Sequence, residues 1–259
     1  MDVISLAGSE GRERALGMPG GRSPWHLGTM GSEENVTTAF LATAEVVATL
    51  VGHPTVGRTW DRPSVLPHMT VGDLAAHLAR AVNNVDTYLA EPAGSSGTSG
   101  PQGGADAAAG GEGVDGPGYF LAFDDLGPDV DSGLNRAVRE RARAEASPGW
   151  RAVRETLGRS RENLARRLAE MEPTDPIRVL GSMDMELADY LRTRLIEMAV
   201  HLDDLAVSVG VDTPALPPGV SQLVIADLVE MARRRHGDLA VLRSLTRRER
   251  DPVEALRVL

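Results

Sequence analysis

Apolar residues recur along most of this chain at the three-to-four-residue spacing that places them on one face of a helix. The spacing predicts helices over residues 33–51, 70–90, 147–171, 185–209 and, beyond residue 218, up to about residue 235. The charged stretch 134–146 is predicted to lead into the third helix, and the tail after residue 235 to form one or two short helices. No series of alternating segments indicates strands. The pattern predicts an all-α fold, an antiparallel four-helix bundle with a short helical C-terminal extension.

Polar residues at the ends of these segments supply start and stop signals. Thr70 and Asp73 have the T-x-x-D spacing of a capping box at the start of the second helix. Ser147 followed by Pro148 is a good N-cap and first-turn pair, so we expect the third helix to begin there. Gly210 is expected to end the fourth helix, because glycine readily adopts the left-handed conformation of a C-terminal cap.

The periodic segments also divide the chain into regions. Residues 1–30 are glycine-rich without sustained period, and we expect them to be disordered; Met30 is an alternative start of the protein. Residues 31–211 are predicted to form the bundle, with residues 212–259 as its helical extension. Residues 91–118 are low-complexity Gly, Ala and Ser, which predicts a flexible insert that does not contribute to the core.

Composition narrows the classes of partner. The net charge is −10, so the chain lacks the basic surface that nucleic-acid binding needs, and all 27 basic residues are Arg. No run of about 18 apolar residues predicts a membrane span. The chain has no Cys, which excludes disulfides, a cysteine nucleophile and thiolate metal ligands from the protein itself and fits a reducing cytoplasm. Any thiol chemistry therefore needs a thiol cosubstrate.

Three polar residues at the margins of apolar stripes carry the candidate chemistry. Glu197 and His201 are four residues apart, so both side chains lie on one face of the predicted fourth helix, with Arg194 on the same side. His77 has an equivalent position beside the stripe of the second helix. Two His and one carboxylate form a three-ligand set that suits zinc or another divalent metal and leaves a position open. Hydrogen-bonded structural histidines at helix margins are the alternative interpretation.

Two motifs resemble those of the mycothiol-dependent maleylpyruvate isomerase family. Its motif P-G-W-T-V-x-D-L-x-x-H-L is similar to LPHMTVGDLAAHLAR, residues 66–80, and its motif R-x-x-E-x-x-x-H-x-x-D-L is similar to DYLRTRLIEMAVHLDDLA, residues 189–206. The resemblance covers about residues 33–210 and implies a DinB-like four-helix bundle. It also implies metal ligands at His77, Glu197 and His201, zinc as the usual metal, and mycothiol, the thiol of actinobacteria, as cosubstrate. An arginine-only composition of the high-GC type agrees with an actinobacterial source.

The chain departs from the family pattern in two places. His68 and Met69 replace the Gly-Trp of the first motif, and His68 is expected to be a solvent-facing loop residue, with an approach to the metal as the alternative. The isomerase itself has a larger C-terminal domain that helps form its active site, whereas about 48 residues follow the bundle here. This difference weakens the transfer of the specific maleylpyruvate activity more than that of the metal chemistry.

Three functions remain open from the sequence. The first is a mycothiol-dependent transferase or isomerase-like enzyme, in which a thiolate adds to an electron-poor carbon of a small-molecule substrate. The others are a metal-dependent hydrolase on the same scaffold and a non-catalytic metal-binding module. Arg194 is the candidate for binding a substrate carboxylate, with a salt bridge to a bundle acid as its alternative role. Asp204 either orients His201 or is a solvated surface residue.

Overall fold

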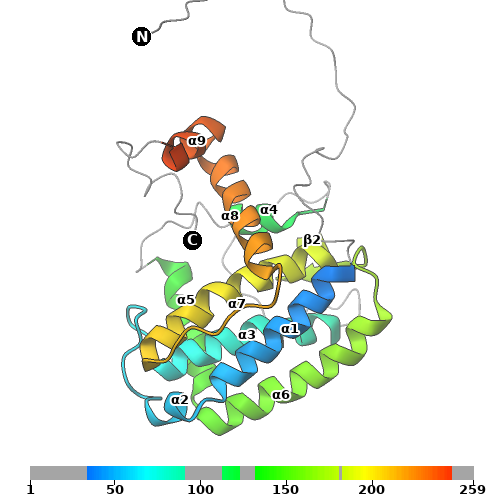
Figure 1. The fold of residues 1–259 in the computed structure, drawn as a ribbon. Helices are drawn as coiled ribbons and strands as arrows, with labels where there is room; N and C mark the ends of the chain where they lie inside the picture. Colours follow the sequence, from blue (N-terminus) through cyan, green and yellow to red (C-terminus); the bar gives the residue numbers. More distant parts are fainter. Residues whose placement is uncertain (1–33, 91–112, 123–131, 181–182, 247–259) are drawn as a thin grey trace, which may run out of the picture. The chain divides into compact units, whose positions relative to one another are not determined.

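The computed structural model describes residues 34–90, 113–122, 132–180 and 183–246. Within these ranges the chain is almost entirely helical, which confirms the all-α prediction (Figure 1). Residues 1–30 and most of the predicted insert lie outside the described residues. The helices are α1 (Glu34–Val51), α2 (Pro54–Arg58), α3 (Val71–Ala90), α4 (Gly116–Leu121), α5 (Gly133–Ala146), α6 (Trp150–Arg167), α7 (Leu187–Val209), α8 (Val220–His236) and α9 (Asp238–Thr246).

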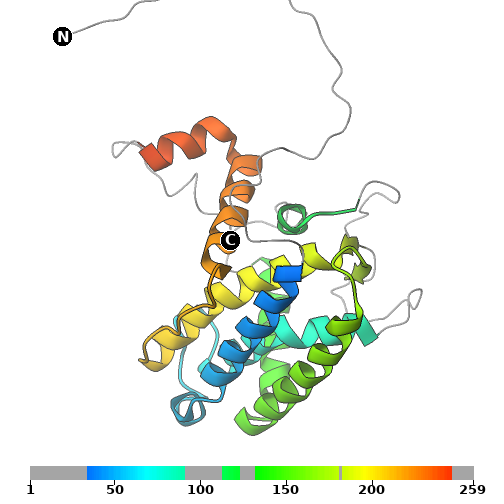
Figure 2. The same cartoon turned by 45° about the vertical axis from the view of Figure 1, so that its right-hand side comes forward.

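Four long helices make the central bundle. Helix α1 packs against α6 and α7, and α3 packs against the same two helices (Figures 1 and 2). Helix α5 covers α3, and α8 packs on α7 and on α4. The four helices with the predicted apolar stripes are therefore those that pack together, because each has a stripe to remove from water.

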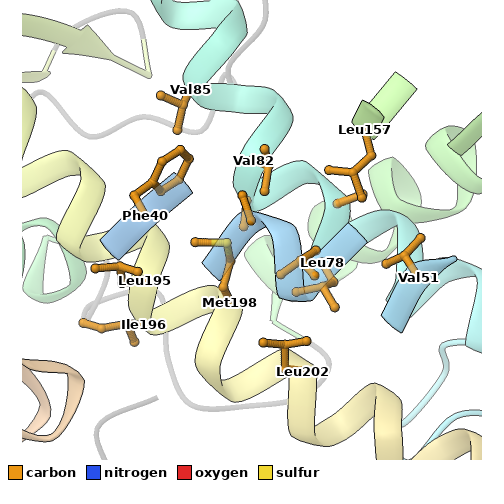
Figure 3. Packing of buried hydrophobic residues seen from close by; sticks show 14 of the residues in the cluster. Phe40, Val51, Leu78, Val82, Val85, Leu157, Leu195, Ile196, Met198 and Leu202 are labelled. Carbon is orange, nitrogen blue, oxygen red and sulfur yellow. The ribbon is translucent and has the colours of Figure 1, made fainter. Parts of the chain in front are cut away.

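The core between these helices is aliphatic. Phe40 of α1, Leu78 and Val82 of α3, and Met198 and Leu202 of α7 are all buried and belong to one cluster (Figure 3). Burying apolar surface stabilises the fold by about 25 cal/mol per Å². Side chains of α3 and α7 belong to the same cluster, so the helices that bear His77 and Glu197 pack on a shared core.

Helix ends follow the predicted signals in two of three cases. The Thr70 Oγ1 atom accepts from the Asp73 backbone N–H at 3.1 Å, and the Asp73 carboxylate accepts from the Thr70 N–H at 2.9 Å, which confirms the capping box of α3. Gly210 ends α7 with φ 69°, as expected. The predicted N-cap at Ser147 is wrong: Ser147 is the C-cap of α5, and α6 begins after Gly149.

The α5–α6 junction explains this error. Gly149 has φ 89°, a left-handed backbone conformation that glycine adopts readily and that turns the chain between the two helices. Trp150 then donates from Nε1 to the Val51 carbonyl at 2.7 Å and ties the start of α6 to the end of α1. Helix α6 thus begins without a side-chain cap, and its first residue is held by a hydrogen bond to a residue 99 positions away. No local sequence pattern reveals such a contact.

A small antiparallel hairpin precedes α7, contrary to the expectation of no strands. Strand β1 (Pro176–Val179) pairs with β2 (Met183–Glu186), with Ile177 opposite Met185. Both of these side chains are buried, so the hairpin adds one apolar face to the core. The predicted fourth helix therefore begins too early, since Met185 lies in β2 and α7 begins at Leu187. Four-residue strands are too short for their alternation to stand out from a helical period.

The insert prediction also needs correction at its C-terminal end. Residues 116–118 form the first turn of α4, because the Asp115 carboxylate caps the helix by accepting from the Gly118 N–H at 2.8 Å. Before the helix, the Val114 N–H donates to the Asp184 carbonyl at 3.1 Å and attaches the segment to the hairpin. The Gly-, Ala- and Ser-rich composition before α4 shows no helical spacing of apolar residues, so the sequence did not indicate where this short helix begins.

The start of α3 offers a test of packing beside the site. A Cβ at Gly72 would lie 2.5 Å from the Trp60 ring, whereas a Cβ at Gly158 in α6 meets nothing within 4 Å. We expect Gly72→Ala to lower the free energy of unfolding by about 1–3 kcal/mol through overpacking. Gly158→Ala is expected to raise it by about 0.5–1 kcal/mol, because alanine loses less backbone entropy in a helix interior. Chemical denaturation of both variants checks this, and the same sign for both would contradict it.

Candidate metal centre

The structure brings the three predicted ligands together. His77 extends from α3, and Glu197 and His201 extend from successive turns of α7. The Glu197 Oε2 atom lies 3.8 Å from Nε2 of His77 and 3.5 Å from Nε2 of His201. The imidazole rings are 4.7 Å apart between centroids and inclined by 70°. One ligand atom from each residue lies within 4.8 Å of the others, and all three side chains are partly buried.

These distances fit a divalent cation. Ligand atoms about 2.1 Å from a tetrahedral zinc are roughly 3.4 Å from one another, close to the separations between Glu197 and each histidine. At 3.8 Å, the His77–Glu197 pair is beyond hydrogen-bond distance, so a direct bond does not explain their approach. Two neutral imidazoles and one carboxylate supply a charge of −1, so a divalent ion held there keeps a net positive charge.

The two histidines differ in their outer partners. The His201 Nδ1 atom lies 2.9 Å from the Asp204 carboxylate, which leaves Nε2 directed toward Glu197. Such a carboxylate fixes the ring and the tautomer of a metal-binding histidine. The contact favours the orienting role of Asp204 over the solvated-residue alternative. The His77 Nδ1 atom is buried and has no hydrogen-bond partner among the described residues.

Burial and mutual contacts shift the pKa values of all three residues. Burial, with the nearby His201, lowers the pKa of His77 to about 4. Burial by itself would raise the pKa of Glu197, but the hydrogen bond with His201 and the charge of Arg194 lower it to about 2. Burial likewise opposes the charge on His201, yet bonds to Asp204 and Glu197 raise its pKa to about 9. At neutral pH, a cation must therefore displace the His201 proton to bind both imidazoles.

Arg194 is buried one turn before Glu197. Its guanidinium carbon lies 5.2 Å from the ring centre of Tyr119 and 5.0 Å from that of Tyr190. Its Nε atom donates to the Thr193 hydroxyl at 3.0 Å, while Nη2 is buried without a hydrogen-bond partner among the described residues. Two aromatic rings therefore contact this cation, and its charge also interacts with the Glu197 carboxylate of the same helix.

Sequence reasoning missed the tyrosines. The chain has three, Tyr88, Tyr119 and Tyr190, and they come from α3, α4 and α7. The Tyr190 ring lies 5.7 Å from the Tyr88 ring and 6.5 Å from the Tyr119 ring. Tyr190 precedes Arg194 by four residues, which is a helical-face signal that the sequence contains. No local pattern indicates that the other two join it, because their helices meet only through tertiary packing.

A second cationic group borders His77. Arg80 follows His77 by three residues on α3, and its Nη1 atom lies 3.3 Å from the Glu145 carboxylate of α5. Its positive charge contributes to the low pKa of His77. His68, by contrast, is exposed in the loop before α3 with φ 63° and is not part of the three-residue cluster. The solvent-facing expectation for His68 agrees with this exposure.

Comparison with known protein families matches residues 40–206 to the mycothiol maleylpyruvate isomerase N-terminal domain. The matched range covers well over half of the chain and includes α3 and most of α7, with all three residues of the cluster. It ends before α8. No curated protein and no solved structure matches the chain. Among the helices that the structure describes, none is long and apolar enough to cross a membrane.

Proposed function

The chain belongs to the mycothiol maleylpyruvate isomerase N-terminal domain family, and from this premise we propose that it is a divalent-metal-dependent enzyme that uses mycothiol. Its reaction is of the transferase or isomerase type, with an electrophilic small molecule as the second substrate. The observation that carries the proposal is the convergence of His77, Glu197 and His201 from two helices. A cytoplasmic location fits the cysteine-free chain and the thiol cosubstrate.

In this proposal His77, Glu197 and His201 hold zinc or another divalent ion and leave a position for the thiol. A cation there favours the thiolate form of a coordinating thiol near neutral pH. The chain has no cysteine that competes for that position. Asp204 keeps the His201 ring turned toward Glu197. The carboxylate of Glu197 supplies the only negative charge of the ligand set, so the loaded site still attracts an anion.

Arg194 is proposed to bind the second substrate. The guanidinium is a fixed cation beside Glu197, and its Nη2 atom is a free donor among the described contacts. A carboxylate is the group that best matches a planar guanidinium. Arg194 is buried against the Tyr119 and Tyr190 rings, which strengthens such a contact because charges interact more strongly in a low-dielectric environment.

Cobalt substitution tests directly whether the thiol of mycothiol binds the metal. We expect mycothiol added to the cobalt-loaded protein to produce a sulfur-to-metal charge-transfer band in the near ultraviolet. The band should persist well below pH 8.5, roughly the value at which a free cysteine-type thiol loses its proton. Mycothiol blocked by S-methylation is the matched ligand control and should give no thiolate band. The His201→Ala protein should give no band with free mycothiol.

An unchanged cobalt spectrum at saturating mycothiol, with the metal still bound, would reject the thiol-dependent function. A metal-dependent hydrolase and a non-catalytic module would then be the candidates. Arg194→Met should retain the band, because Arg194 is assigned to the second substrate and not to the thiol. Loss of the band in that variant would place the arginine at the thiol and change its assignment.

A further inference from the structure

Helix α4 brings Tyr119 into the site from outside the bundle. The helix contacts α7 and α8 (Figures 1 and 2). Its Tyr119 ring centre lies 5.2 Å from the Arg194 guanidinium carbon. Gly116 packs close to α7, where a Cβ would lie in ordinary van der Waals contact with the Asp189 carbonyl oxygen, at 3.5 Å. A helix of six residues is too short to be stable by itself. The position of Tyr119 therefore depends on the contacts that hold α4.

The most specific of these contacts comes from α8. Arg234 donates from Nη1 and Nη2 to the two carboxylate oxygens of Asp115, at 2.8 and 2.6 Å. This is a bidentate pair, which fixes orientation as well as distance. The same Asp115 carboxylate accepts from the Gly118 N–H and starts α4. One residue thus both begins the helix and attaches it to α8.

Helix α8 is in turn attached to the helix that carries the site. Arg192 of α7 donates from Nε to the Asp227 carboxylate of α8 at 3.1 Å, and its Nη2 contacts the other oxygen. Asp227 is buried, with 3% of its surface exposed, while Arg192 is partly exposed, so the pair is screened less than a fully exposed one. Contacts thus join α7 to α8, α8 to the start of α4, and Tyr119 of α4 to Arg194 of α7.

We propose that Arg234 is a positioning residue of the site, which holds Tyr119 against Arg194 by fastening α4 through Asp115. The tyrosine ring then keeps the guanidinium in one orientation, with Nη2 available to a ligand. The inference rests on the proposed role of Arg194 as the substrate-binding residue. It assigns a function to α8, which lies beyond the residues matched to the family.

The three tyrosines of the chain make the proposal measurable. All three belong to this cluster, so protein labelled with 3-fluorotyrosine has three fluorine resonances, and each reports on the site. Substituting each tyrosine with phenylalanine in turn assigns the resonances. The full-length chain is used, and neither a thiol nor a substrate is needed.

Four variants separate positioning from a general loss of structure. Arg234→Gln and Asp115→Asn each remove the ion pair, and asparagine retains a side-chain oxygen for the cap. Arg233→Gln is the matched control, because Arg233 shares the Glu230 contact but pairs with Asp238 and not with α4. Arg234→Lys keeps the cation and tests rescue. The pair is partly exposed, so its loss should leave the bundle folded.

We expect the Tyr119 resonance to move toward the free-amino-acid position in Arg234→Gln and Asp115→Asn. It should remain near its wild-type position in Arg233→Gln. In Arg234→Lys it should move less than in Arg234→Gln, because lysine keeps the charge but not the bidentate geometry. A Tyr119 resonance that is unchanged in both pair-breaking variants overturns the proposal, as does an equal shift in Arg233→Gln. If the resonance moves as expected but cobalt-loaded protein ignores mycothiol, the proposed function fails and the fastening of Tyr119 stands.

Discussion

Replacing His77, Glu197 or His201 with alanine is expected to reduce bound divalent metal from about one ion per chain to a small fraction, by removing one of three ligands. The loss of affinity should exceed the roughly 10- to 100-fold that removing an outer hydrogen-bond partner costs. The helices should persist, because all three side chains lie at the margin of the core and their truncation opens no large cavity. Elemental analysis beside a calorimetric zinc titration measures the effect.

Two further variants sharpen this result. Asp204→Ala removes the oxygen that lies 2.9 Å from His201 Nδ1 and leaves all three ligands in place, so we expect an intermediate loss of roughly 10- to 100-fold. His236→Ala removes an exposed imidazole at the end of α8 and should leave the metal content unchanged. Wild-type metal content in all three ligand variants would end the proposal of a metal centre there.

Phe40→Ala is expected to lower the free energy of unfolding by about 3–5 kcal/mol. The side chain is fully buried and belongs to the core cluster that joins α1, α3 and α7 (Figure 3), so its removal loses the transfer energy of the ring and leaves a cavity. Val207→Ala on α7 is the control, because Val207 is 56% exposed and should change stability by no more than about 0.5 kcal/mol. Denaturant titration of both variants measures the difference.

The same variant tests whether the core and the site act independently. Helix α1 carries no proposed ligand, so saturating zinc should stabilise Phe40→Ala and the wild type by similar amounts. At 100 times the dissociation constant this amounts to about 2.7 kcal/mol. In His77→Ala, zinc should no longer raise the free energy of unfolding, because one of the three ligands is missing. A smaller increment in Phe40→Ala than in the wild type would show instead that the core sets the distance between the two halves of the site.

The sequence by itself determined the features that depend on neighbours along the chain. A helical period needs only residues three and four positions apart, and the all-α class and the long helices follow from it. The capping box joins residues three apart, Thr70 and Asp73, and is present as predicted. Glu197 and His201 were identifiable as a pair for the same reason, because a helix places them on one face whatever surrounds it.

Tertiary structure decided what depends on residues distant in sequence. It placed His77 of α3 beside the α7 pair, 120 positions before Glu197, a convergence that the spacing only suggested and that the resemblance implied. Tertiary contacts also determined that α6 begins after Gly149. Residues 183–186 form a strand because β1 pairs with them. Tertiary packing also placed the Tyr119 and Tyr190 rings against Arg194, with Tyr88 on Tyr190, and it joined Arg234 to Asp115 across 119 positions. Such contacts depend on how packed helices meet, and the chain encodes that only through the core as a whole.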